Sequence, residues 1–346
     1  MNNTLAAIIS VIISFAVTAL LGIVLIPALH KLKFGQNILT DIGPKWHAKK
    51  QGTPTMGGIM FIIGIIFATV VTLLVCKFTS FEVFSQTAEL KSNEIIKLVS
   101  GIMLALCFSL VGFADDYIKV AKKRNLGLTE IQKTIPQLLI IAAYLATLGI
   151  SNNTSMLIPG LGRIAIDSIP GQIFFYVFGA CVIYGAVNAV NFTDGLDGLC
   201  ASVTLPVGIA FAVMAAMYKL TSISILGAAL AGGCAGYLIW NHYPAKVMMG
   251  DTGSMFLGGL IVALSYSIDC PIILIFVGII YVIEALSDVI QIGSIKLRHK
   301  KVFKMAPIHH HFEMSGWSEK KIDAVFTLIS TIGCAVGVVL MYYTVK

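Results

Sequence analysis

Ten long apolar segments run through almost the whole chain and restrict its possible folds more than any other feature. A helix that crosses a bilayer needs about 20 mainly apolar residues. Such segments lie near residues 5–29, 57–77, 95–113, 135–150, 172–190, 200–217, 223–240, 254–269, 271–294 and 322–344. Charged residues make up only 12% of the 346 residues, about half the share found in soluble domains. The sequence therefore predicts an all-α integral membrane protein with about ten transmembrane helices, in one domain over residues 1–346.

Basic residues are distributed unevenly among the loops that join these segments. The loops after the first, third, seventh and ninth segments hold most of the Lys and Arg residues, and the opposite loops hold few. Because basic loops stay on the cytoplasmic side of a membrane, we expect both termini to lie outside. This asymmetry accounts for the net charge of +7 and favours contact with anionic lipids and phosphorylated substrates. It gives no indication of nucleic-acid binding.

Residues 191–198 combine one Asn, two Asp and two Gly directly after an apolar segment. Asn191, Asp194 and Asp197 are spaced by three, so on a continuing helix they would share one face. Gly195 and Gly198 are poor helix formers and favour a frayed or turned backbone. Each polar residue alone is explained equally well as a helix cap. Together they favour a metal or phosphate site at a membrane border.

Three further carboxylates lie at the ends of apolar segments. Asp115 and Asp116 are adjacent at the end of the third segment, and ionising both near lipid requires a metal ion or nearby lysines. A solvated helix end is the alternative, although carboxylates at a helix C-terminus oppose its dipole. Asp251 lies in the sequence Gly-Asp-Thr-Gly, at the start of the eighth apolar segment. Backbone N–H groups at a helix start favour a carboxylate or a bound anion. A first-turn cap explains Asp251 equally well.

The last third of the chain carries polar residues within or beside apolar sequence. Glu284, Asp288 and Gln291 lie in the ninth segment and must face the protein interior or a wet groove, as structural groups or as substrate contacts. The following loop contains three consecutive histidines, residues 309–311. Consecutive side chains point in different directions, which disfavours a zinc site. Imidazoles that contact phosphates or a sugar fit this basic loop better.

The predicted topology brings the carboxylate groups, lysines and histidines to the cytoplasmic face. Carboxylates from several loops at one membrane face describe an oxygen-ligand cation site that handles phosphates. Mg²⁺ is the expected metal, because it keeps bound water and bridges carboxylates to phosphate oxygens. A secondary transporter is the alternative class, but transporter sites lie near the bilayer midplane.

These motifs resemble those of the polyprenyl-phosphate phospho-sugar transferases. The similarity lies in Asp115-Asp116, residues 191–198, residues 249–254 and residues 307–313. Residues 52–58 and the histidine run are similar to the phospho-N-acetylmuramoyl-pentapeptide transferases, the MraY type. The resemblance covers essentially the whole chain.

The resemblance implies transfer of phospho-MurNAc-pentapeptide from UDP-MurNAc-pentapeptide to undecaprenyl phosphate in the bacterial cytoplasmic membrane. The products are lipid I and UMP, and the active site faces the cytoplasm. A sister transferase that uses UDP-GlcNAc is the alternative within the family. A homodimer, a membrane groove for the polyprenyl tail and a bend in the ninth segment near residues 284–291 are implied in the same way.

The resemblance also assigns roles to individual residues. Asp251 would bind Mg²⁺, and Asp115 and Asp116 would serve the lipid phosphate or the metal, so these three form the catalytic set. Direct attack by the lipid phosphate and a covalent aspartyl intermediate both remain open. The implied substrate-binding residues are Lys50, Thr55, Asn191, Asp194, Gly195, Asp197 and Gln291 for the nucleotide and sugar, Lys119, Lys123 and Lys133 for phosphates, and His309, His310 and His311 for the sugar-peptide side. Met248 stands where the family has a Phe that can stack on uracil, and a thioether can also pack on a ring.

Overall fold

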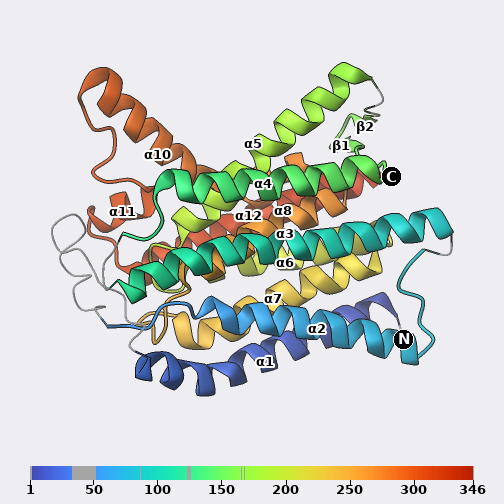
Figure 1. Ribbon diagram of the computed structural model, residues 1–346, viewed down its shortest axis with the longest axis horizontal. Helices are drawn as coiled ribbons and strands as arrows, with labels where there is room; N and C mark the ends of the chain where they lie inside the picture. Colours follow the sequence, from blue (N-terminus) through green and yellow to red (C-terminus); the bar gives the residue numbers. More distant parts are fainter. Residues whose placement is uncertain are drawn as a thin grey trace.

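The computed structural model describes residues 2–32, 52–85, 87–122, 126–164, 166 and 168–345, and these fold into helices and one short hairpin. The helices are α1 (Asn3–Lys31), α2 (Gly58–Phe78), α3 (Ala88–Ala121), α4 (Glu130–Ile150), α5 (Ile169–Thr193), α6 (Leu199–Met217), α7 (Thr221–Asn241), α8 (Gly250–Ser267), η2 (Pro271–Ile273), α9 (Leu274–Val277), α10 (Ile279–Arg298), α11 (Ile308–Glu313) and α12 (Glu319–Val345). The strands β1 (Met156–Ile158) and β2 (Gly162–Ile164) pair antiparallel. The long helices form one bundle, from which α5 and α10 diverge (Figure 1).

Eight helices of the described chain are long and apolar enough to cross a membrane, namely α1 to α7 and α12. The pair α9 and α10 is a ninth candidate, bent by 88°. The predicted segment at 254–269 corresponds to α8, which is not among these candidates, so length and composition support eight or nine of the ten expected spans. All of α8 from Thr252 to Ser267 is buried. Protein rather than lipid surrounds this helix, and it therefore tolerates more small and polar residues than a lipid-facing span.

The bend in the ninth segment lies at Gly278, between α9 and α10. The bend that the family resemblance implied for this segment is therefore present, but it lies before residues 284–291, where it was expected. The Gly278 N–H donates to the Leu274 carbonyl over 2.9 Å, and a side chain at 278 would lie 2.6 Å from that oxygen. Glycine allows this close turn, whereas Glu284 and Gln291 lie within the regular helix α10.

Small residues let α3 pack closely against α8. A Cβ at Gly112 of α3 would lie 2.1 Å from the Asp251 carbonyl oxygen, and one at Gly259 of α8 would lie 2.9 Å from Ala105 Cα. Such contacts between small residues are typical of helix packing in membranes. The first turn of α8 is thereby held directly against the last turns of α3.

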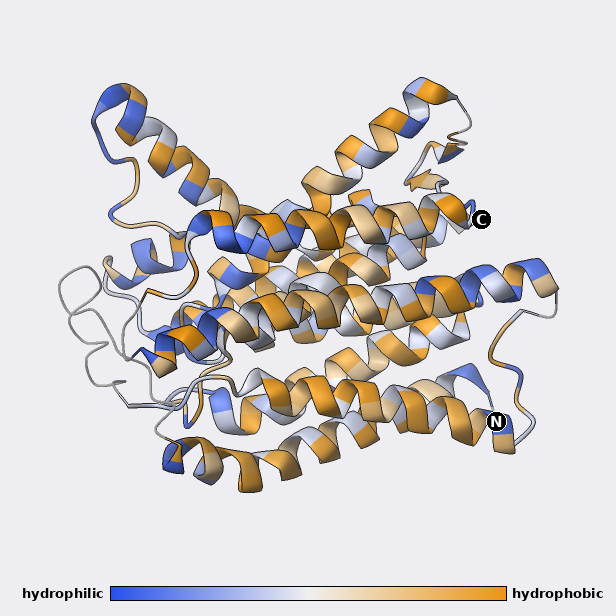
Figure 2. Ribbon diagram, in the orientation of Figure 1, coloured by the Kyte–Doolittle hydropathy of each residue, from blue (hydrophilic) through white to orange (hydrophobic). Residues whose placement is uncertain are grey.

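The two ends of the bundle differ in what they carry. The start of α1, the end of α12 and the β1–β2 hairpin share one end, and α11 lies at the other (Figure 1). Hydrophilic residues gather at the ends of α3, α4 and α10, while hydrophobic residues dominate the middle of the helices (Figure 2). Both termini thus lie at the same end, as the predicted topology requires.

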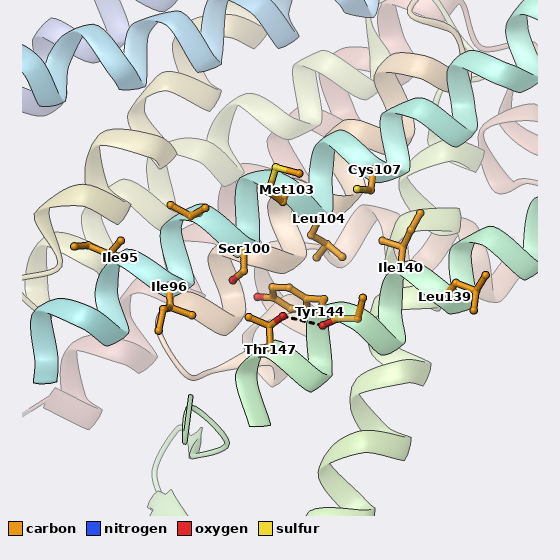
Figure 3. Close-up of a pocket in the computed structure, with 12 residues that line it drawn as sticks. Ile95, Ile96, Ser100, Met103, Leu104, Cys107, Leu139, Ile140, Tyr144 and Thr147 are labelled. Carbon is orange, nitrogen blue, oxygen red and sulfur yellow. Dashed lines mark hydrogen bonds between the residues drawn. The ribbon is translucent and has the colours of Figure 1, made fainter. Parts of the chain in front are cut away.

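An apolar groove of about 630 Å³ lies between α3 and α4. Ser100 and Leu104 of α3 face Tyr144 and Thr147 of α4 across it (Figure 3). The residue of α3 in this groove that is nearest to Asp115 is Cys107, about 12 Å away along the helix at its usual rise. The groove therefore lies away from Asp115 and Asp116, and we assign it no part in the chemistry described next.

Candidate active site

Three carboxylates from two helices meet at the α11 end of the bundle. Asp115 and Asp116 lie in the last turns of α3, and Asp251 lies in the first turn of α8. One oxygen from each lies within 4.8 Å of the others. Asp115 and Asp116 are only 3% and 2% exposed. The close helix contact at Gly112 thus brings together the three acidic residues that the sequence placed at one membrane face.

Asp116 holds the beginning of α8. Its carboxylate accepts hydrogen bonds from the backbone N–H of Asp251 over 3.2 Å, from the N–H of Thr252 over 2.9 Å and from the Thr252 hydroxyl over 2.7 Å. These donors are the N–H groups that a helix start leaves without helical partners, and the helix dipole favours a negative charge there. Both oxygens of Asp116 are therefore engaged with α8.

Two lysines partly neutralise the other two carboxylates. Lys119 lies 2.5 Å from Asp115 and 3.4 Å from Asp251, and Lys133 of α4 lies 2.6 Å from Asp251. The second oxygen of Asp115 accepts from the Leu128 N–H over 2.8 Å. When all three carboxylates are ionised they face two ammonium groups, and one negative charge is then in excess. A cluster of carboxylate oxygens with excess negative charge suits a hard divalent cation.

Thr55 borders the carboxylate cluster because residues 54–58 pair with the loop before α8. Met248 N–H donates to the Pro54 carbonyl over 2.7 Å, and Gly57 N–H donates to the Met248 carbonyl over 2.9 Å. A Cβ at Gly250 would lie 2.8 Å from Thr55 Oγ1 and 2.5 Å from Asp116 Oδ2, and the φ of +73° at Gly250 also favours glycine. Thr55 is buried and Met248 is half-buried. Lys50, predicted to contact the nucleotide and sugar, and Lys123, predicted to bind phosphate, lie outside the described residues.

Residues 191–198 comprise the end of one helix and the turn that leads to the next, as their glycines predicted. Helix α5 ends at Thr193 and α6 begins at Leu199, with Gly198 at φ +81°. Asp194 receives a hydrogen bond from the backbone of Gly250; burial raises its pKa well above the usual range, and the charges of Asp251 and Asp116 raise it further. This turn therefore lies directly beside the carboxylate cluster.

The other polar residues of this turn differ in their partners. The buried carboxylate of Asp197 accepts from the Ala245 N–H over 2.9 Å, so it holds the loop between α7 and α8. Asn191 lies in the last turn of α5, and its Nδ2 is buried without a hydrogen-bond acceptor in the part of the chain that the structure describes. A buried amide donor without an acceptor is a group that a ligand can satisfy.

The three histidines point to three different protein groups, as their consecutive positions predicted. His309 Nδ1 lies 3.0 Å from Glu284 Oε2, and His310 Nδ1 lies 2.6 Å from Glu313 Oε2. His311 Nδ1 accepts from the backbone N–H of Lys304 over 3.1 Å. A Cβ at Gly195 would lie 2.2 Å from His309 Nε2. Of the three, His309 thus lies against the turn at residues 191–198.

Gln291 is used by the backbone of the segment that leads to α11. Its Oε1 accepts from the N–H groups of Val302 and Phe303, and its Nε2 donates to the Phe303 carbonyl, each over 3.0 Å. Gln291, which was predicted to bind substrate, therefore holds the backbone of residues 302 and 303 in place.

Sequence reasoning missed two residues that build the site. Thr252 supplies two of the donors to Asp116. Asn241 accepts from the Gly198 N–H over 3.1 Å and donates to the Val247 carbonyl over 2.9 Å. Both could have been recognised from their positions in the sequence. Thr252 directly follows Asp251, and Asn241 is the polar residue at the end of an apolar segment.

Comparison with known proteins gives a consistent result. The model of glycosyl transferase family 4 matches residues 95–269, and signature 1 of the phospho-N-acetylmuramoyl-pentapeptide-transferases matches residues 50–62. Proteins named phospho-N-acetylmuramoyl-pentapeptide-transferase are similar over nearly their whole length. The one from Acetivibrio thermocellus is 44% identical over 94% of this chain and 92% of its own length. Those from Clostridium perfringens strain SM101 and Heliobacterium modesticaldum are each 42% identical, over 95% of this chain and 94% and 96% of their own lengths.

Proposed function

Because the chain belongs to the family of phospho-N-acetylmuramoyl-pentapeptide transferases, we propose that the carboxylate cluster of Asp115, Asp116 and Asp251 is its catalytic centre. The chain is a multi-pass membrane enzyme of the MraY type, which acts in lipid I synthesis for peptidoglycan. Its proposed donor is UDP-MurNAc-pentapeptide, and its proposed acceptor is undecaprenyl phosphate. UMP is the second product.

The cluster fits Mg²⁺ by the chemistry of its ligands. Asp251 and Asp115 offer carboxylate oxygens, the ligand type that Mg²⁺ prefers, whereas Asp116 is engaged with α8. When bound, the metal supplies neutralisation of charge on the pyrophosphate. Lys119 and Lys133 are 33% and 21% exposed at the same place. Their ammonium groups are suited to bind phosphate oxygens of the two substrates and to stabilise negative charge as UMP leaves.

The contacts favour direct attack by the lipid phosphate. A phosphate monoester has its second pKa near 6, so it is largely dianionic at pH 7 and needs no general base. One of its oxygens forms a bond to the β-phosphorus of the donor, and the bond from that phosphorus to the oxygen bridging to UMP breaks. The rival mechanism requires a nucleophilic aspartate. The oxygens of Asp116 accept three hydrogen bonds, and those of Asp115 contact Leu128 and Lys119, which weakens both as nucleophiles.

The donor pocket is proposed to lie between the turn at residues 191–198 and α11. Asn191 Nδ2 and His309 Nε2 are buried and have no hydrogen-bond partner among the described residues. They support this placement, since substrate hydroxyls and amides can satisfy them. Thr55, Asp194 and Gly195 border the same region. Lys50 is proposed to contact the nucleotide and sugar, and Lys123 is proposed to bind the phosphates. Asp197 and Gln291, with His310 and His311, bond mainly to protein groups, so we propose that they shape the pocket.

We further propose that the α11 end faces the cytoplasm of a bacterial cell. The excess of Lys and Arg in the loops of this end supports the orientation through the positive-inside rule. A homodimer embedded in membrane lipid is proposed from the family resemblance alone.

The single observation that carries the catalytic proposal is the meeting of three carboxylates and two lysines at the start of α8. The test supplies purified protein with undecaprenyl phosphate, Mg²⁺ and either UDP-MurNAc-pentapeptide or UDP-GlcNAc, and measures UMP. We expect UMP with the first donor only. UMP release from UDP-GlcNAc instead would support the sister transferase. No UMP from either donor would contradict the proposed function, and a transporter is already disfavoured because the acids lie at one end of the bundle.

A further inference from the structure

Glu284 of α10 and His309 of α11 form a fully buried pair. The two side chains are 0% and 1% exposed, and His309 Nδ1 lies 3.0 Å from Glu284 Oε2. The backbone N–H of His309 approaches the same oxygen at 3.5 Å. When the Glu284 carboxylate is ionised it can only accept hydrogen bonds, and the proton of the contact then lies on Nδ1. Nε2 is then the ring nitrogen that is left for another partner.

Nε2 of His309 faces the turn that borders the carboxylate cluster. It is buried and has no hydrogen-bond partner within the described ranges. A Cβ at Gly195 would lie 2.2 Å from it, so any larger residue at 195 would cover this nitrogen. Proteins rarely bury a polar atom without a partner. The neighbouring Asp194 contacts Gly250, next to Asp251, which puts Nε2 on the side of the site where the donor's sugar is proposed to bind.

Asp288 is the other acidic residue beside this pair. It lies one turn further along α10, half-buried, and interacts electrostatically with both Glu284 and His309. The hydrogen bond to Nδ1 comes from Glu284. Asp288 therefore provides a matched control, because it shares the helix, the charge and the neighbourhood but not the contact.

We propose that Glu284 is a positioning residue that fixes the tautomer and orientation of His309. By accepting the Nδ1 proton, it presents the lone pair of Nε2 at Gly195, where the ring accepts a hydrogen bond from a hydroxyl or amide N–H of the donor sugar. This inference rests on the proposed function and deepens it. A carboxylate that orients a histidine in this way is a recurring arrangement, and its loss costs activity even though it never touches substrate.

The direct test is nitrogen NMR of full-length protein labelled with ¹⁵N in its histidine rings and embedded in lipid nanodiscs. His309→Gln identifies the signal of residue 309 by its disappearance. We expect wild type to carry the proton on Nδ1. Glu284→Gln should keep this tautomer because its amide oxygen still accepts, whereas Glu284→Ala should shift the proton towards Nε2. An unchanged tautomer in Glu284→Ala would overturn the proposal.

Kinetics provide the second readout. Glu284→Ala should lower kcat on the order of tenfold to a hundredfold, the range seen when groups that orient a histidine are removed, and Glu284→Gln should recover most of it. Asp288→Asn should keep both tautomer and kcat. Equal losses in the Gln and Ala variants would overturn the positioning role.

Gly195→Ala supplies a variant that leaves Glu284 in place. Its methyl group would lie 2.2 Å from Nε2, so the imidazole ring must shift away from the donor site and kcat should fall, and full activity in this variant would contradict the placement of the donor. Failure of the proposed function is distinguishable, since wild type would then release no UMP while its histidine tautomer could still be read.

Discussion

Asp116 and Thr252 are joined by two hydrogen bonds, from the Thr252 backbone N–H at 2.9 Å and from its hydroxyl at 2.7 Å. Residues 136 positions apart in sequence thus connect the end of α3 to the start of α8. Because Asp251 directly precedes Thr252, this contact also fixes the orientation of the Asp251 side chain, the third carboxylate of the cluster.

The Thr252 hydroxyl should contribute measurably to stability. Thr252→Val keeps the shape but removes a hydrogen bond to a charged group, which costs roughly 1.5–3 kcal/mol. We expect a lower midpoint of thermal unfolding, measured in detergent by intrinsic fluorescence, together with weaker metal binding. Thr252→Ser retains the hydroxyl and should stay close to wild type. Equal stability of the Val variant and wild type would show that the hydroxyl bond is dispensable.

Removal of the Asp251 carboxylate should abolish metal binding at the cluster. Asp251→Asn eliminates one of the two anionic ligands that the proposed site offers, so we expect loss of UMP release and of bound Mn²⁺, used as a paramagnetic substitute for Mg²⁺. Electron paramagnetic resonance measures the bound ion directly. Asp288→Asn, which removes a carboxylate on α10, should bind Mn²⁺ as wild type does. Normal Mn²⁺ binding by Asp251→Asn would exclude Asp251 as a ligand.

Much of the fold could be predicted because apolar length is a local property of the sequence. The complete burial of α8 could not be predicted. A helix surrounded by protein does not need the apolar composition of a lipid-facing helix, and only the packing shows what surrounds it. A bend in the ninth segment was expected, but its position at Gly278 could not be predicted, for a similar reason. Glycine occurs in many straight membrane helices, and the contact with the Leu274 carbonyl is visible only in three dimensions.

The candidate site, like the fold, could be predicted only in part. The meeting of Asp115 with Asp251 followed from topology, which places loops on one face of a membrane. The partner of each polar group did not follow, because it depends on residues far along the chain. Asp197 holds Ala245, and Gln291 holds Phe303, so two residues expected to face substrate have their groups bonded to backbone.

We expect the main role of Lys133 to be binding of substrate phosphate oxygens, with only a small contribution to the stability of the fold. Its side chain is 21% exposed and its ammonium group pairs with Asp251 over 2.6 Å, so Lys133→Met removes a cation from the edge of the cluster. We expect the KM for the UDP-sugar to rise about tenfold, the effect of losing roughly 1.4 kcal/mol from a charged hydrogen bond. The exposed Lys122 at the end of α3 provides the control. A KM that rises equally in Lys122→Met would indicate a general charge effect instead of a specific contact.

Met248 should be replaceable by the residue that the family has at this position. It is half-buried on the loop tied to Pro54, and Phe offers a flat face for the uracil ring. We expect Met248→Phe to keep or tighten nucleotide binding, as measured by calorimetric titration with UDP-MurNAc-pentapeptide. A clear loss of affinity would remove residue 248 from the uracil contact.

Asp197 should affect the donor more than the metal. Its carboxylate is 3% exposed and accepts from the Ala245 N–H over 2.9 Å, which holds the loop that carries Met248. Asp197→Ala leaves this N–H without its acceptor, whereas Asp197→Asn retains an amide oxygen that can replace it. We therefore expect both variants to weaken UDP-sugar binding, the Ala variant more strongly, while Mn²⁺ binding changes little. Titration calorimetry and paramagnetic resonance on the same preparations separate the two effects. If metal binding fell further than UDP-sugar binding, Asp197 would belong to the metal site, and the turn at residues 191–198 would be an acidic ion-binding hinge, not the floor of the donor pocket.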